Sequence, residues 1–224
     1  MKKLLITIDG PAGAGKTSVS RTLAEKLGYQ YIDTGALYRG VAYEVKSQGI
    51  DPENETDRAA LCGRLQLAFK QESGELRLYS VDKNISGLIR TPEISLLASA
   101  VSAKSVVRAY LLDVQRKIGQ QKAAVFEGRD MGTVVFPAAD VKFFLDASSR
   151  IRARRRYDEL KSDSSQSLKQ VEADMQRRDG NDRSRSLAPL KPADDAILID
   201  STDLTIQEVV DTMLSHIARL KGQG

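Results

Sequence analysis

Residues 10–17 constrain the fold of this chain more than any other feature. Their letters, GPAGAGKT, fit the pattern G-x-x-x-x-G-K-[ST] at every fixed position. An apolar run at residues 4–9 precedes them, and a helical pattern with Val19, Leu23 and Leu27 at four-residue spacing follows. A buried strand, a glycine-rich turn and a helix in this order form the setting in which the pattern binds phosphate.

The spacing of this phosphate loop has a chemical reason. Glycines let the backbone approach phosphate oxygens closely because no Cβ intervenes. The N–H groups of the loop and of the helix N-terminus then face the anion. The ammonium of Lys16 would reach the β- and γ-phosphates, and the hydroxyl of Thr17 would bind Mg²⁺. The alternative is a glycine-rich turn without a ligand, which the strand–loop–helix setting disfavours.

Four further apolar runs, each ending at an acidic residue, occur at residues 29–33, 124–127, 141–146 and 196–200. Strands that are apolar nearly throughout are typical of a parallel sheet covered on both faces. Helical patterns lie between them, and Thr205 with Glu208 forms a capping box before the last one. The chain is therefore predicted to be an α/β protein with a five-stranded parallel sheet flanked by helices.

One segment departs from this alternation. Residues 66–90 contain short runs of period two, such as Leu76 to Tyr79, and a turn signal at Ser73-Gly74. We expect an insertion of antiparallel strands there, followed by a long helix through residues 106–118. The serine-rich residues 162–167 are expected to form a surface loop.

Composition excludes some classes of protein but does not identify the partner of the basic clusters. Cys62 is the one cysteine, so an internal disulfide and a cysteine metal cluster are excluded, and a buried thiol in the cytoplasm is expected. No apolar run approaches the ~20 residues of a membrane helix. The net charge is +4, with arginines gathered at residues 150–156 and 177–185. Such clusters can bind nucleic acid or phosphate ligands, or can lie on a solvated face.

A phosphate loop is shared by kinases, GTPases and motor ATPases. The sequence has no Asn-Lys-x-Asp run for reading guanine and no clear apolar run ending in Asp-Glu. The size of the chain and its insertion favour a small kinase. A nucleic-acid-binding NTPase is disfavoured, because aromatic residues are only 5% of the chain and no stacking run is visible.

Three further segments are more specific than the loop. They read DTGALYR at residues 33–39, EGRDMGTVVFP at 127–137 and RDGNDRSR at 178–185. With IDGP at residues 8–11, they make nearly the whole chain resemble the bacterial cytidylate kinase family. The resemblance implies one kinase domain over residues 1–224. Within it, an acceptor-binding region lies at about 35–105 and an arginine-rich lid at about 150–185.

The resemblance also implies the substrates, which are MgATP as donor and CMP or dCMP as acceptor. The residues that would bind ATP are Gly10, Pro11, Ala12, Gly13, Ala14, Gly15, Lys16, Thr17 and Ser18, with Thr17 also on Mg²⁺. The positions that match CMP-binding residues are Thr34, Arg39, Ser99, Arg108, Arg129, Asp130, Arg178, Asp182 and Arg185.

These residue types suit the chemistry of a nucleoside monophosphate. Guanidinium groups bind phosphate bidentately. A carboxylate at Asp130 would accept from the exocyclic amine of cytosine and would repel the carbonyl of uracil. Arg108 could contact the base carbonyl, and Asp182 could accept from a ribose hydroxyl. The sequence leaves open which arginines contact phosphate and which contact base; a helix cap or a solvated side chain is the ordinary alternative for each residue.

Arg152, Arg155 and Arg156 have the i, i+3, i+4 spacing that places side chains on one face of a helix. The resemblance makes this segment a lid over ATP, whose arginines with Lys16 would stabilise charge on the moving phosphoryl group. A basic solvated face is the alternative. No general base is expected, because the phosphate of CMP is already anionic.

Two positions depart from the common family pattern. Glu127 stands where aspartate is frequent, and Thr34 where serine is common. The other possible functions are a small kinase for UMP, AMP or a non-nucleotide such as shikimate, and the nucleic-acid-binding NTPase. We expect a cytoplasmic monomer without nucleic-acid or membrane partners.

Overall fold

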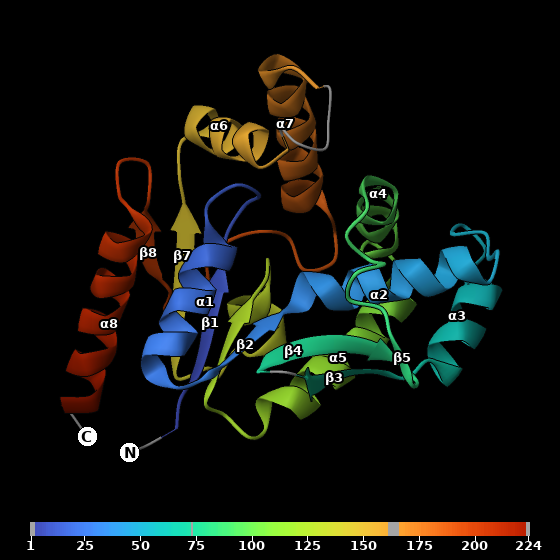
Figure 1. Cartoon of the computed structure of the whole chain (residues 1–224), viewed down its shortest axis with the longest axis horizontal. Helices are drawn as coiled ribbons and strands as arrows, with labels where there is room; N and C mark the ends of the chain where they lie inside the picture. Colours follow the sequence, from blue (N-terminus) through green and yellow to red (C-terminus); the bar gives the residue numbers. More distant parts are fainter. Residues whose placement is uncertain (1–2, 73, 161–165, 223–224) are drawn as a thin grey trace. The chain divides into compact units, whose positions relative to one another are not determined.

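The computed structural model describes residues 3–72, 74–160 and 166–222 (Figure 1). The chain divides into two compact units, of which the first comprises residues 1–31 and 122–224 and the second residues 32–121. Ser73 of the predicted turn and residues 162–165 of the predicted serine-rich loop lie outside the described residues.

The first unit is built on a parallel sheet in the strand order β2-β6-β1-β7-β8. The strands are β1 (Leu5–Asp9), β2 (Gln30–Asp33, which begins in this unit), β6 (Ala124–Glu127), β7 (Val141–Asp146) and β8 (Ile197–Asp200). The central strand β1 pairs in parallel with both β6 and β7, and β7 pairs in parallel with β8. The predicted five-stranded parallel sheet is confirmed, with each strand within one residue of its expected bounds.

The helices of this unit are α1 (Lys16–Leu27), α6 (Ser149–Leu160), α7 (Leu168–Ser184) and α8 (Ile206–Gly222), and a π-helical turn, η1, spans Met131–Val135. Ile6 and Phe143 of the sheet pack with Leu23 of α1 and Val210 of α8 in one buried apolar cluster. Figure 1 shows α1 and α8 beside the sheet, and α6 and α7 beyond the end of β7. The sheet therefore supports helices on its face and at the carboxyl ends of its strands.

The connection from β1 to α1 depends on glycine. Gly10 has φ +148°, and a Cβ there would lie 1.9 Å from the carbonyl oxygen of Leu145. No side chain fits at that distance, so only glycine lets the chain leave β1 in this direction. At the other end of α1, Gly28 caps the helix in the left-handed conformation, with φ 66°.

The last helix begins as its sequence predicts. The Thr205 hydroxyl accepts from the backbone N–H of Glu208 at 3.3 Å, and the Glu208 carboxylate accepts from the backbone N–H of Thr205 at 2.8 Å. This reciprocal pair satisfies two N–H groups at the start of α8. The predicted capping box is confirmed.

The second unit combines helices with a small antiparallel sheet. Its elements are α2 (Thr34–Ser47), α3 (Glu55–Arg64), β3 (Leu67–Glu72), β4 (Glu75–Ser80), β5 (Lys83–Asn84), α4 (Pro92–Val101) and α5 (Ser105–Gly119). The strand order β3-β4-β5, with antiparallel pairing, confirms the predicted insertion. The helix expected through residues 106–118 is α5, and α4 precedes it as a separate helix.

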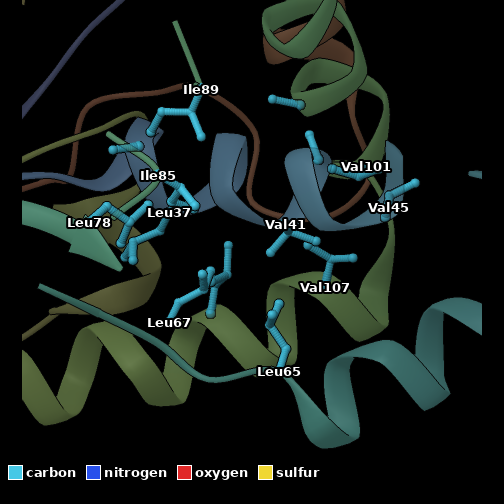
Figure 2. Packing of buried hydrophobic residues seen from close by; sticks show 14 of the residues in the cluster. Leu37, Val41, Val45, Leu65, Leu67, Leu78, Ile85, Ile89, Val101 and Val107 are labelled. Carbon is cyan, nitrogen blue, oxygen red and sulfur yellow. The ribbon is translucent and has the colours of Figure 1, made fainter. Parts of the chain in front are cut away.

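The core of this unit lies between α2 and the elements β3, β4, α4 and α5 (Figure 2). Leu37, Val41 and Val45, which repeat at four-residue spacing, are fully or almost fully buried and pack in one cluster with Leu67 of β3 and Val107 of α5. Cys62 is buried in the same cluster, as expected for a structural thiol.

No single helix among the described residues is long and apolar enough to cross a bilayer. Taken together, α4 and α5 have sufficient length and hydropathy, but they meet at a bend of 100°.

Candidate active site

Lys16 is the first residue of α1, and its side chain packs against the phosphate loop. Its ammonium donates a 2.7 Å hydrogen bond to the carbonyl oxygen of Pro11, and the residue is only 4% exposed. Burial and, to a smaller extent, the Arg129 charge lower the pKa of Lys16 to about 7, although Glu127 and Asp9 oppose the shift. A buried ammonium with few compensating charges is stabilised by an anion, so the loop is suited electrostatically to a phosphate ligand.

Three backbone carbonyls of the phosphate loop accept hydrogen bonds from side chains. Pro11 accepts from Lys16, Ala12 accepts from Nη1 of Arg152 at 3.0 Å, and the Ser201 hydroxyl lies 3.2 Å from the carbonyl oxygen of Ala14. In a trans peptide the N–H points opposite to the preceding C=O. Each of these bonds therefore fixes the orientation of one loop peptide, and with it the direction of the following N–H group.

The hydroxyl of Thr17, at the end of the loop, donates to Oε1 of Glu127 at 2.9 Å. The hydroxyl of Tyr31 donates to Oε2 of the same carboxylate at 2.6 Å. Hydroxyl and carboxylate oxygens are the donors that Mg²⁺ prefers, and this ion keeps several waters when it bridges phosphates. The residues present therefore fit a magnesium ion brought by a triphosphate. Among the described residues, no group of three or more His, Cys, Asp and Glu could hold a metal.

Four of the predicted acceptor residues come together in the first unit. Nε of Arg129 lies 3.2 Å from Oδ2 of Asp182. Arg185 lies 3.6 Å from Oδ1 of Asp182 and 3.8 Å from Oδ1 of Asp130, which is 2% exposed. The cluster alternates guanidinium and carboxylate groups at the carboxyl end of β6, where open α/β sheets bind ligands. Arg178, on α7, is exposed, and its charge contributes to the lowered pKa of Lys16.

The other predicted acceptor residues lie in the second unit, on three helices. Thr34 and Arg39 are on α2, Ser99 is on α4 and Arg108 is on α5.

Asp33 caps α2 and orients Arg39. One oxygen of Asp33 accepts from the N–H of Ala36 at 3.0 Å, and the other accepts from Nη2 of Arg39 at 2.7 Å. Nε of Arg39 is buried and has no hydrogen-bond partner within the described part of the chain. Arg108 donates to the carbonyl of Ser102 at 3.3 Å and stands 5.8 Å from the ring of Tyr38. Asp33 therefore holds the Arg39 guanidinium at Nη2.

The three arginines predicted for the lid all lie on α6 but differ in their surroundings. Arg152 is buried, with Nη1 at 2.5 Å from Oδ2 of Asp179. Arg155 is half-buried and donates to the hydroxyl and the carbonyl of Ser201 at 3.0 and 2.7 Å. Arg156 is more exposed and pairs with Glu159 at 3.0 Å. Helical spacing alone does not give these three side chains one role.

Four residues of this site were not singled out from the sequence, namely Asp9, Tyr31, Asp179 and Ser201. Both oxygens of Asp9 accept backbone hydrogen bonds, from Met131 at 2.9 Å and Gly132 at 2.7 Å. Burial raises the pKa of Asp9 to about 6. In the sequence, Asp9 ends an apolar run and belongs to the IDGP segment, and neither signal indicates these contacts. Its contacts join residues more than a hundred positions apart, so only the fold shows them.

Comparison with solved structures supports the fold. A shikimate kinase from Bacteroides thetaiotaomicron matches with a TM-score of 0.52 and 12% identity, over 97% of this chain and 99% of that one. A gluconokinase from Sinorhizobium meliloti matches with a TM-score of 0.51 and 16% identity, over 97% and 93%. The parallel sheet, the loop after its central strand and the buried Lys16 define a phosphate-loop fold.

Sequence comparison gives the family. A sequence model of the cytidylate kinase family matches residues 6–219. The cytidylate kinase of Geobacter sulfurreducens is 49% identical over 215 residues, which cover 96% of this chain and 92% of that protein. Cytidylate kinase 1 of Haemophilus influenzae is 46% identical over 217 residues, with coverage of 96% and 94%. The chain belongs to the cytidylate kinase family and is a nucleoside monophosphate kinase, which confirms the resemblance seen in its motifs.

Proposed function

We propose that this chain transfers the γ-phosphoryl group of MgATP to CMP or dCMP, giving ADP and CDP or dCDP. The observation that carries the choice of acceptor is the buried carboxylate of Asp130 within a cluster of arginines, in a chain whose relatives are named cytidylate kinases. Such a carboxylate can accept from the exocyclic amine of cytosine. The arginines around it can neutralise a phosphate.

The donor site is formed by residues 10–18. The N–H groups of the loop surround the phosphates, and Lys16 contacts the β- and γ-phosphates. A bound magnesium ion would supply positive charge to the phosphates. Thr17 would bind that ion through its hydroxyl, and Glu127 would act through water, since it already accepts the Thr17 hydroxyl bond.

The acceptor site combines the residues predicted from the sequence. Asp130 reads the base, Asp182 accepts from a ribose hydroxyl, and Arg39 contacts the phosphate with its guanidinium. The remaining positions expected to contact the acceptor are Thr34, Ser99, Arg108, Arg129, Arg178 and Arg185. These guanidinium groups offset the repulsion between two anionic substrates.

Catalysis here needs alignment and charge stabilisation rather than a general base. Lys16, Arg155 and Arg156 stabilise charge on the moving phosphoryl group. Arg152 is instead buried, with Nη1 bonded to the carbonyl of Ala12 and to Asp179. Closure of the lid at about 150–185 and the acceptor-binding region at about 35–105 would exclude water and limit hydrolysis of ATP. We further expect a cytoplasmic monomer that acts without nucleic-acid or membrane partners.

The test is the rate of ADP production with MgATP and one acceptor at a time. CMP and dCMP should give much higher kcat/KM than UMP, AMP or shikimate. A preference for UMP, AMP or shikimate would overturn the choice of acceptor. ATP hydrolysis that is stimulated by RNA or DNA and not by CMP would favour a nucleic-acid-binding NTPase.

A further inference from the structure

The guanidinium of Arg152 is enclosed by acceptors from three segments. Nε donates to the carbonyl of Ala147 at 2.9 Å, and Nη2 donates to the Ser149 hydroxyl at 3.3 Å. Nη1 donates both to the carbonyl of Ala12 at 3.0 Å and to Asp179 at 2.5 Å. A guanidinium has five N–H donors in one plane. With four such bonds and a side chain 5% exposed, Arg152 has little left to offer a phosphoryl group.

The bond to Ala12 acts on the phosphate loop itself. The carbonyl of Ala12 and the N–H of Gly13 belong to one planar peptide and point in opposite directions. When Arg152 holds the carbonyl, the N–H of Gly13 is turned to the other side of the loop. Ser201 fixes the peptide between Ala14 and Gly15 in the same way, through the carbonyl of Ala14.

The helix that carries Arg152 also packs on the loop through its backbone. A Cβ at Gly13, where φ is +72°, would lie 2.7 Å from the carbonyl oxygen of Arg152 and 2.7 Å from Cε of Met175. Ala153, Val171 and Met175 form a small buried cluster against which Ala12 packs. The ion pair between Arg152 and Asp179 therefore joins α6 and α7 at the point where both meet the loop.

We propose that Arg152 is a positioning residue. Its guanidinium, held by Asp179, fixes the peptide between Ala12 and Gly13 so that the N–H of Gly13 faces the phosphates of the nucleotide. Arg155 and Arg156 remain to contact the group in transfer. The inference rests on the proposed binding of ATP at the loop. It reverses the expectation that Arg152 acts on the γ-phosphoryl group.

MgADP separates the two roles because it lacks the γ-phosphoryl group. Affinity for MgADP is measured by calorimetry for Arg152→Lys, Asp179→Asn and the double variant, together with kcat. Loss of a preorganised hydrogen-bond donor commonly changes the affinity or the rate by about tenfold or more. Each single variant should therefore bind MgADP about tenfold more weakly. The double variant should be little worse than either single one, because the two residues act as a unit. Unchanged MgADP affinity with a large loss of kcat would overturn the proposal.

Two variants on the same helix serve as comparisons. Arg154 is exposed and pairs with Asp158, so Arg154→Lys should leave both MgADP affinity and kcat unchanged. Arg156→Lys should lower kcat while MgADP affinity is retained. If Arg156→Lys and Arg152→Lys show the same pattern, the separation of their roles is wrong.

Loss of a buried partner can also destabilise the fold, so thermal unfolding is recorded for every variant. The pair Arg152→Met with Asp179→Leu replaces the ions by apolar side chains, which commonly retains or increases stability. It should still bind MgADP weakly, because nothing then holds the carbonyl of Ala12. MgADP affinity equal to that of the unaltered chain in Arg152→Lys, in Asp179→Asn, or in the pair Arg152→Met with Asp179→Leu would refute the role. Failure of the unaltered chain to phosphorylate CMP would instead refute the proposed function.

Discussion

The Asp9 carboxylate, at the end of β1, accepts a 2.7 Å hydrogen bond from the backbone N–H of Gly132, in the first turn of η1. Its other oxygen accepts from Met131 at 2.9 Å. Arg129 and Asp130 directly precede these residues. The strand that leads into the phosphate loop therefore also fixes the segment that presents two of the proposed acceptor residues.

The first prediction concerns Asp9→Asn. The amide can accept one of the two backbone bonds, but its NH₂ group would face the other N–H donor. The segment at Arg129 and Asp130 should shift, and KM for CMP should rise about tenfold with a smaller change in KM for ATP. Asp200→Asn is a matched control, since Asp200 also ends a strand but is exposed and bonds to Thr202. Equal changes in both KM values would contradict this assignment.

The second prediction is the effect of pH on the same carboxyl group. Burial raises the pKa of Asp9 from 3.8 to about 6, so the folded state holds its proton more strongly than the unfolded state. The contribution of Asp9 to stability is therefore full below about pH 4 and is lost as the pH rises through 6. Between pH 4 and 7 the unfolding free energy of Asp9→Asn should gain about 2 kcal/mol relative to the unaltered chain. Denaturant titrations at several pH values measure this difference, and parallel pH profiles would argue against it.

The third prediction compares two glycines with positive φ. At Gly10 a Cβ would lie 1.9 Å from the carbonyl oxygen of Leu145, whereas at Gly28 no atom lies within 4 Å. Gly28→Ala should cost only the strain of the left-handed conformation, about 1 kcal/mol. Gly10→Ala must displace the backbone of β7 or of the loop, so it should cost several times more and abolish ATP binding. The two variants are compared by their unfolding midpoints and by titration with ATP. Equal losses of stability and of ATP affinity in both variants would contradict the close contact between Gly10 and Leu145.

The fourth prediction concerns the sugar of the acceptor. Asp182 lies among Arg129 and Arg185, so Asp182→Ala should weaken both CMP and dCMP to some extent. If the carboxylate accepts from the 2′-hydroxyl, CMP should lose about tenfold more in kcat/KM than dCMP, as for a charge-assisted hydrogen bond. Steady-state kinetics with both substrates give the ratio. Equal losses would remove Asp182 from the recognition of ribose.

The sheet and the loop could be predicted from sequence because their signals are local. Each strand is a short apolar run that ends at an acidic residue, and the phosphate loop has fixed letters between a strand and a helix. The division of roles among the arginines could not be predicted. The i, i+3, i+4 spacing places Arg152 and Arg156 on one face, but only tertiary packing buries the first and exposes the second.

The same limit applies to Asp9 and Ser201. Asp9 bonds to residues more than a hundred positions later, and the Ser201 hydroxyl reaches the loop from the end of β8. Asp9 belongs to the IDGP segment and Ser201 to none of the quoted motifs, but neither sequence context indicates these contacts. Contacts of this kind depend on strand order, which the sequence pattern does not specify.

The central claim is that phosphate-loop chemistry at Lys16 delivers a phosphoryl group to CMP. It is tested most directly with ATP labelled at the γ-phosphate, CMP and Mg²⁺, with products separated by chromatography. The unaltered chain should place the label in CDP. Lys16→Ala should do so at least about 10²-fold more slowly, since it lacks a preorganised charge at the transferring group. Label found only as inorganic phosphate, or transfer to CDP at a normal rate in Lys16→Ala, would contradict the account.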